Sequence, residues 1–138
     1  MSKPSMKTLR ARNHEDHLQE QCIAWFEAFF RGSERLRIHH SPNGGKRNLI
    51  EAAKFKRMGV RAGFPDLWIS LGNGQTGFIE LKYGRNGLTD AQKTYRDFLI
   101  EQGYRWALCR SLDEFISALQ NWGLMKNKAF INRKKEEG

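Results

Sequence analysis

The sequence predicts one α/β domain built around a mixed β-sheet. Three observations predict it: an apolar stripe at helical spacing near the N-terminus, short apolar runs around a glycine-rich turn in the middle, and two helix-capping signals in the C-terminal half. Together they give the order helix, strand, short helix, strand, strand, helix, strand, helix, which is typical of helices packed on a sheet. A chain of 138 residues is long enough to bury such a core.

The first predicted helix spans residues 14–31 and is closed by Gly32. Apolar residues recur along it at spacings of three and four, which gives one buried stripe. The stripe consists of Leu18, Cys22, Trp25, Phe26 and Phe29. Alternation of apolar and polar residues then predicts a strand over 35–40. A short helix is predicted over 48–58, and Gly59 ends it.

Two apolar runs, at 67–71 and 78–83, predict a β-hairpin because the glycine-rich segment 72–77 separates them. These glycines also match the Gly-x-Gly-x-x-Gly pattern of dinucleotide-binding loops, in which a helix follows the glycines. Here a strand follows. The segment is therefore interpreted as a turn, and no nucleotide cofactor is expected.

Two capping boxes predict where the last two helices begin. The box at 89–92 starts a helix that stops at Gly103, and the box at 111–114 starts a helix that ends near Gly123. A strand over 105–110 is expected between the two helices.

Composition excludes several classes of protein. No apolar run approaches the roughly 18 residues that a membrane span needs, and the N-terminus does not resemble a signal peptide. Cys22 and Cys109 are isolated, which argues against a disulfide scaffold and against a cysteine-based zinc site. We therefore expect a cytoplasmic protein without a membrane partner.

The formal net charge of +9 is unevenly distributed. The two ends of the chain are basic, at 1–12 and 124–138, and they either attract a polyanion or keep the protein soluble. Between residues 46 and 61, six basic residues stand against a single acid, Glu51. This local patch favours a nucleic-acid partner.

The strongest chemical signal lies in the second strand of the hairpin. Strand alternation places Glu80 and Lys82 on one face, and the hairpin can bring Asp66 beside them. Two carboxylates suit Mg²⁺ or Mn²⁺, and a lysine can orient or help to deprotonate a water molecule. This set predicts metal-assisted phosphodiester hydrolysis. For Glu80 and Lys82 alone, a salt bridge at a sheet edge is the alternative.

The histidines give a weaker signal. His14 and His17 are three residues apart, whereas the zinc-protease helix spaces its histidines four apart. His39 and His40 are adjacent on a predicted strand and point to opposite faces, so that one of them either faces a substrate phosphate or has a structural role.

The acidic residues and the lysine resemble the active-site signature of the PD-(D/E)XK nuclease superfamily. More narrowly, blocks of sequence over about 13–123 resemble the VRR-NUC family, which includes stand-alone phage proteins and a domain of an interstrand-crosslink repair nuclease. The blocks are Pro42-Asn43-Gly44-Gly45, residues 58–67 with Pro65-Asp66, Glu80-Leu81-Lys82 and Leu88-Thr89-x-x-Gln92. The resemblance implies a restriction-endonuclease-like αβββαβ core, with a mixed central sheet flanked by helices, a helical insertion and a C-terminal helix.

The resemblance also implies a role for single residues in the hairpin. Asp66 and Glu80 would bind Mg²⁺ or Mn²⁺, together with the backbone carbonyl of Leu81. Lys82 would serve the attacking water.

Two further candidates lie on helices. Glu15 in the first helix matches the family's glutamate and is a possible metal ligand, with Glu20 as a weaker candidate. Gln92 matches a family glutamine, but it also completes the capping box with Thr89. One amide cannot easily fill both roles, so that its catalytic role stays open.

The implied partner is DNA, in a branched form, and the protein would act as a homodimer. Basic residues expected to contact the DNA backbone, unless they form a solvated basic face, are Lys46, Arg47, Lys54, Arg57 and Arg61. Residues that would form the dimer contact, or belong to the core instead, are Phe115, Leu119 and Trp122 in the last helix and Phe130 and Ile131 in the tail.

We expect a basic N-terminal arm at 1–12, a nuclease domain at 13–123 and a basic tail at 124–138. The expected function is a metal-dependent DNA endonuclease that selects four-way junctions or flaps during phage replication, recombination or repair, in the host-cell cytoplasm. A sequence-specific restriction or homing endonuclease and a non-catalytic DNA-binding module are the alternatives.

Overall fold

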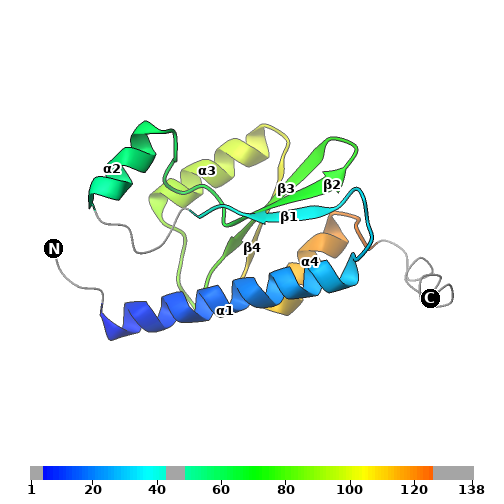
Figure 1. The fold of residues 1–138 in the computed structure, drawn as a ribbon, viewed down its shortest axis with the longest axis horizontal. Coiled ribbons are helices and arrows are strands. Elements are labelled where there is room, and N and C mark those ends of the chain that lie inside the picture. Colours follow the sequence, from blue (N-terminus) through cyan, green and yellow to red (C-terminus); the bar gives the residue numbers. More distant parts are fainter. Residues whose placement is uncertain (1–4, 43–48, 126–138) are drawn as a thin grey trace.

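The computed structural model of the chain describes residues 5–42 and 49–125. Within these residues, four helices and four strands follow one another in the predicted order (Figure 1). The elements are α1 (Met6–Phe29), β1 (Arg37–His40), α2 (Leu49–Arg57), β2 (Leu67–Gly72), β3 (Gln75–Leu81), α3 (Asp90–Glu101), β4 (Arg105–Cys109) and α4 (Leu112–Asn121).

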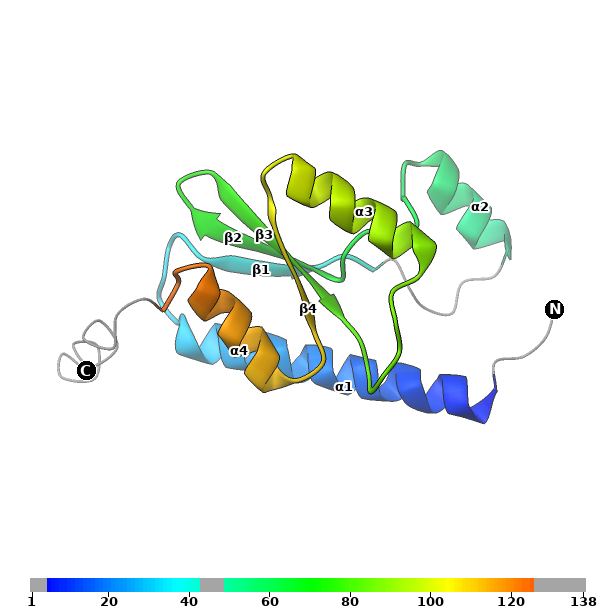
Figure 2. The same cartoon turned by 180° about the vertical axis from the view of Figure 1, so that it is seen from behind.

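The sheet is mixed and has the order β1-β2-β3-β4. β1, β2 and β3 pair antiparallel, whereas β4 runs parallel to β3. Figures 1 and 2 show α1 and α4 on one side of the sheet and α3 on the other. The predicted α/β class and the αβββαβ order are confirmed, with α2 as the insertion and α4 as the C-terminal helix.

The core lies between the sheet and the pair α1 and α4. Alternate residues of β2 and β3 are buried there, among them Leu67, Ile69 and Ile79, each with no exposed surface. Burying one such side chain stabilises the fold by about 1.5–3 kcal/mol. Because successive strand residues face opposite sides, Glu80 is turned toward α3.

The helix α1 is longer than predicted. It begins at Met6, whereas the prediction began at residue 14. The prediction followed the apolar stripe, but residues 6–13 contain neither proline nor glycine and continue the helix without a stripe. Residues 6–12 of the expected basic arm therefore belong to α1.

The hairpin also differs from its predicted limits. β3 begins at Gln75 instead of residue 78, because Asn73 and Gly74 form a two-residue turn directly before it. Both residues have positive φ, 55° and 77°, as a type I′ turn requires. The segment with the glycine pattern is a turn, as predicted.

The two predicted helix caps differ in detail. At α3, Thr89 and Gln92 form the complete capping box. At α4, the Ser111 hydroxyl accepts a hydrogen bond from the Glu114 N–H (3.1 Å), but the Glu114 carboxylate accepts from the N–H of Arg110 (3.1 Å) rather than of Ser111. Glu114 therefore ties the start of α4 to the end of β4.

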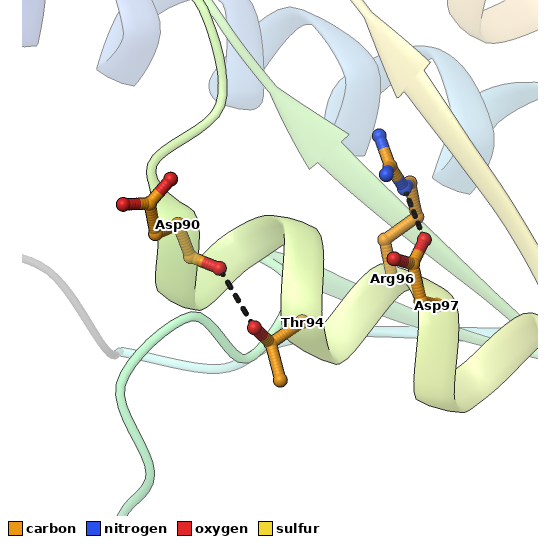
Figure 3. A network of polar contacts seen from close by, with 4 residues as sticks. All are labelled: Asp90, Thr94, Arg96 and Asp97. Carbon is orange, nitrogen blue, oxygen red and sulfur yellow. Dashed lines mark hydrogen bonds and ion pairs between the residues drawn. The ribbon is translucent and has the colours of Figure 1, made fainter.

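Two polar contacts join neighbouring residues on α3 (Figure 3). The Thr94 hydroxyl donates to the carbonyl of Asp90 (3.0 Å), and Arg96 Nε donates to Asp97 Oδ1 (2.8 Å). Such exposed ion pairs contribute at most about 1 kcal/mol. They are not part of the site described below.

The last helix belongs to the core. Phe115 and Leu119 are fully buried, and the Trp122 ring lies so close to Gly77 that a Cβ atom there would overlap with it. Phe115 and Leu119 therefore form core and not a dimer surface, and Phe130 and Ile131 lie outside the described residues. No helix in the described part of the chain is both long and apolar enough to cross a membrane.

Candidate active site

One end of the sheet brings the three predicted catalytic residues together. β2 and β3 pair with Leu67 opposite Ile79, so that the start of β2 lies beside the end of β3. Asp66 directly precedes β2, Glu80 is the last residue but one of β3, and Lys82 directly follows it. The sequence predicted that Asp66 would lie beside Glu80 and Lys82 only if the hairpin had a suitable register. The observed register brings the three residues together.

Asp66 is fixed through both its side chain and its backbone. Its Oδ2 accepts a hydrogen bond from the N–H of Leu81 on β3 (2.7 Å). Its carbonyl oxygen accepts from the N–H of Ser41 (2.8 Å) and lies 3.0 Å from Nδ1 of His40. Asp66 is thus held between β1 and β3, and His40 is the histidine of the pair that contacts its backbone.

Glu80 is the one buried charged side chain among the residues that the structure describes, with 3% of its surface exposed. Burial raises its pKa to about 9, and the neighbouring Asp66 carboxylate adds to this rise. Burial also raises the pKa of Asp66. A buried carboxylate beside a partly buried one favours either a bound proton or a bound cation.

Lys82 lies within electrostatic reach of every acid in the site. Burial raises the pKa of all three acidic groups, and the positive charge of Lys82 counteracts that rise in each of them. The Lys82 N–H donates to the carbonyl of Cys109 (3.2 Å), which continues the β3–β4 pairing one residue beyond β3. The backbone of Lys82 is therefore fixed by β4.

Glu15 reaches the same place from α1. Its Oε1 accepts a hydrogen bond from the N–H of Tyr83 (3.2 Å), and burial raises its pKa. Glu20 is different: its side chain is 78% exposed and lies 4.0 Å from the imidazole of His17. Of the two glutamates considered on this helix, the structure places Glu15 at the site and Glu20 outside it.

Gln92 contacts both the helix cap and the site, and its catalytic role stays a prediction. Its Oε1 accepts from the N–H of Thr89 (2.9 Å) as the second half of the capping box. Its Nε2 donates to Oε1 of Glu80 (2.9 Å). Each contact uses a different atom of the amide, so that the helix cap also orients the buried carboxylate.

Comparison with known proteins gives the family. The VRR-NUC domain matches residues 6–113. The chain belongs to the VRR-NUC family. A solved structure titled "VRR_NUC domain protein" is 36% identical to it with a TM-score of 0.64, over 80% of this chain and 88% of that one. Among curated proteins no match was found. Membership implies a nuclease of the PD-(D/E)XK type, a phosphodiester hydrolase.

The family suggests a divalent metal, and the donor set of this VRR-NUC domain fits one. Among the described residues, no three His, Cys, Asp or Glu side chains converge closely enough to form a complete cage. Asp66 and Glu80 do supply two adjacent carboxylates with raised pKa values. Mg²⁺ is held in proteins by one or two carboxylates and completes its shell with water and substrate phosphate oxygens.

The expected DNA contacts are only partly described. Lys46 and Arg47 lie outside the described residues. Lys54 and Arg57 are exposed on α2, a helix with no buried residue. Arg61 is exposed beyond the end of α2, where its Nη1 donates to the carbonyl of Lys56 (3.2 Å).

One structural residue of the site was missed in the sequence. Arg110 Nη1 donates to the carbonyls of Gly84 (2.8 Å) and Asn86 (2.7 Å). It thereby anchors the loop that leads from Lys82 to Gln92. No local pattern signals this contact, because the partners are separated by 26 and 24 positions in the sequence.

Proposed function

We propose that this VRR-NUC protein is a DNA endonuclease that depends on Mg²⁺ or Mn²⁺. The observation that supports it most is the buried Glu80 with the partly buried Asp66 beside it and Lys82 nearby, at the end of the sheet. Two neighbouring carboxylates, one of them buried, destabilise a fold unless a proton or a cation neutralises them. In a family of phosphodiester hydrolases, a catalytic cation is the direct explanation.

Asp66 and Glu80 would hold the cation, with the Leu81 carbonyl as a further oxygen donor. A divalent cation in such a site stabilises the charge that develops on the phosphate and makes water a better nucleophile. Lys82 orients the attacking water, whose oxygen bonds to phosphorus as the bond to the leaving sugar oxygen breaks. Gln92 keeps the Glu80 carboxylate in place, and Glu15 would supply a further ligand from α1.

Branched DNA is the proposed substrate, as a four-way junction or a flap. The described residues form one compact α/β domain and no separate base-reading module. Such a nuclease must select its substrate by shape and deformability rather than by base sequence. Two copies would suit a junction with two equivalent strands, and we propose a homodimer acting in phage replication, recombination or repair.

The test is cleavage of end-labelled four-way junction, flap and linear duplex DNA with Mg²⁺, Mn²⁺ or EDTA. We expect metal-dependent cutting of the branched substrates in preference to the duplex. Glu80→Gln should abolish cutting and retain DNA binding, whereas Glu101→Gln, an exposed acid at the end of α3, should cut normally.

The same experiment separates the alternatives. Cutting of the duplex at fixed positions would favour a sequence-specific restriction or homing enzyme. DNA binding without cleavage under any metal condition would favour a non-catalytic module. Unchanged cleavage by Glu80→Gln would show that the site lies elsewhere.

A further inference from the structure

The ends of the four strands form a row at the catalytic edge of the sheet. In the order of the strands, this row is Ser41 after β1, Asp66 before β2, Lys82 after β3 and Arg110 after β4. Adjacent strands are about 4.8 Å apart, so the row spans about 14 Å. In B-form duplex DNA each strand rises about 3.4 Å per nucleotide along the helix axis, so this length corresponds to about four nucleotides.

A pocket lies at each end of this row. The β1-side pocket has a volume of about 330 Å³ and is lined by His39, Ser41, Arg61 and Tyr95 among others. The β4-side pocket has a volume of about 440 Å³ and is lined by His14, His17, Gln21, Tyr83 and Arg110 among others. Neither pocket has an Asp or a Glu in its lining, although the groups between them are acidic.

The β4-side pocket carries an aromatic platform. The rings of His14 and Tyr83 are stacked, with their centroids 4.2 Å apart and their planes within 10° of parallel. Each of them is the chain neighbour of a residue in the active site, His14 of Glu15 and Tyr83 of Lys82. Their backbones are therefore held where the catalytic groups are held, and their rings are presented beside those groups.

Arg110 adds a positive charge to this platform. Its Nη1 is engaged by two loop carbonyls, and a guanidinium has five N–H donors in all. The guanidinium is thus fixed in position at the pocket while it carries its charge. His17 contributes less, because it lies near Glu20 on the exposed surface of α1.

We propose that the β4-side pocket is a nucleotide subsite for the DNA strand that is cut. The base of a nucleotide next to the cleaved phosphodiester stacks on the platform of Tyr83 and His14, and the adjoining phosphate lies near Arg110. A π-face is common to all bases, so this contact holds the strand without reading its sequence. The inference rests on the proposed nuclease function, and it places the bound strand along the row of strand ends.

The test measures binding of a single-stranded oligonucleotide by the full chain in EDTA, where no cleavage occurs. Fluorescence anisotropy gives the affinity, and 2-aminopurine placed at successive positions reports stacking by its quenching. Tyr83→Leu should weaken binding about fivefold or more and relieve the quenching, since loss of a stacking aromatic has effects of this size. His14→Ala should change both quantities in the same direction.

Tyr104→Leu is the matched control. Tyr104 is 44% exposed, close to the 40% of Tyr83, but it precedes β4 at the opposite end of the sheet. Its affinity and quenching should equal those of the wild type. Circular dichroism checks that each variant is folded. If Tyr83→Leu does not fold, the affinity of His14→Ala and the quenching measured with the wild type still test the proposal.

Three results would overturn the subsite. The first is wild-type affinity in both Tyr83→Leu and His14→Ala, and the second is an equal loss of affinity in Tyr104→Leu. The third is the absence of 2-aminopurine quenching at every position. Cleavage assays with metal are run separately. If the two platform variants cleave DNA normally and bind the oligonucleotide like the wild type, the subsite proposal is wrong and the nuclease proposal stands. If the wild type cleaves no DNA but the two platform variants bind the oligonucleotide more weakly, the subsite proposal stands and the nuclease proposal is wrong.

Discussion

Gln92 donates a hydrogen bond from Nε2 to Oε1 of Glu80 over 2.9 Å, while its own Oε1 caps the first turn of α3 at Thr89. The single amide therefore joins the start of a helix to a buried carboxylate. Since Glu80 faces α3 rather than the core, its position depends on where that helix begins. This link between a local folding signal and the site suggests several experiments.

Separating the two roles of Gln92 requires a matched pair of variants. Thr89→Ala removes half of the capping box and leaves the Glu80 contact, so it should lower the free energy of unfolding by about 1 kcal/mol with cleavage largely retained. Gln92→Ala removes both contacts and should lower stability and cleavage together. Denaturant unfolding and cleavage rates give the comparison. Equal cleavage in the two variants would show that the amide contributes only as a cap.

The stability of the metal-free protein should fall as pH rises. The folded pKa of Glu80 is raised by burial to about 9 from an ordinary value of 4.5. The fold thus prefers the protonated acid, and this contribution is complete below pH 4.5 and is lost as pH rises toward 9. One proton gives a slope of about 1.4 kcal/mol per pH unit.

Thermal melts in EDTA between pH 5 and 9 measure this effect. Asp66, whose pKa burial also raises, contributes in the same direction. Adding Mg²⁺ should flatten the upper part of the profile, since a cation replaces the proton. A metal-free stability that increases between pH 6 and 9 would contradict the raised pKa values of Glu80 and Asp66.

Replacing Glu80 by an uncharged residue should stabilise the metal-free fold and weaken metal binding. Glu80→Gln keeps an oxygen that can accept from Gln92 but removes the charge, so the metal-free variant should melt higher than the wild type at pH 8. Its Mn²⁺ binding, measured by calorimetry, should be lost or strongly weakened. Mn²⁺ affinity equal to that of the wild type would remove Glu80 from the set of ligands.

Lys82 should affect catalysis more than metal binding. Lys82→Met keeps an apolar stem of similar length and removes the ammonium group near the three acids. Cleavage should fall by about 10²- to 10⁴-fold, the usual range for a group that assists proton transfer or orients the nucleophile, while Mn²⁺ affinity is retained. Loss of metal binding as well would assign Lys82 a mainly structural role.

Gly63 should be intolerant of substitution because it packs against the start of α3. It has φ of +82°, and a Cβ atom there would overlap with the backbone of Ala91. Gly63→Ala should therefore destabilise the fold by more than about 1 kcal/mol and displace Gln92. Gly59→Ala, with positive φ but open space around the site of its Cβ, should cost less. Chemical denaturation of both variants, with cleavage rates, tests the difference.

Most of the fold could be predicted from the sequence because its signals are local. The turn at Asn73-Gly74, the cap at Thr89 and the apolar stripe of α1 each act over a few residues, and they give the order of the elements directly. The predicted limits of α1 and β3 were wrong, since α1 begins at Met6 and β3 at Gln75. Helix propensity and turn geometry extend these elements beyond the apolar residues that marked them.

The sequence by itself determined which residues form the candidate site: the resemblance to a nuclease family selected Asp66, Glu80, Lys82, Glu15 and Gln92. Only the tertiary structure decided how they meet. The hairpin register places Asp66 beside Glu80, the packing of α3 delivers Gln92 to Glu80, and Arg110 anchors the loop between Lys82 and α3. These relationships join residues that are 12 to 26 positions apart, and no local pattern contains them. Burial gives the meeting of the two acids its chemical effect, because the fold takes Glu80 fully and Asp66 partly out of water and so raises the pKa of both.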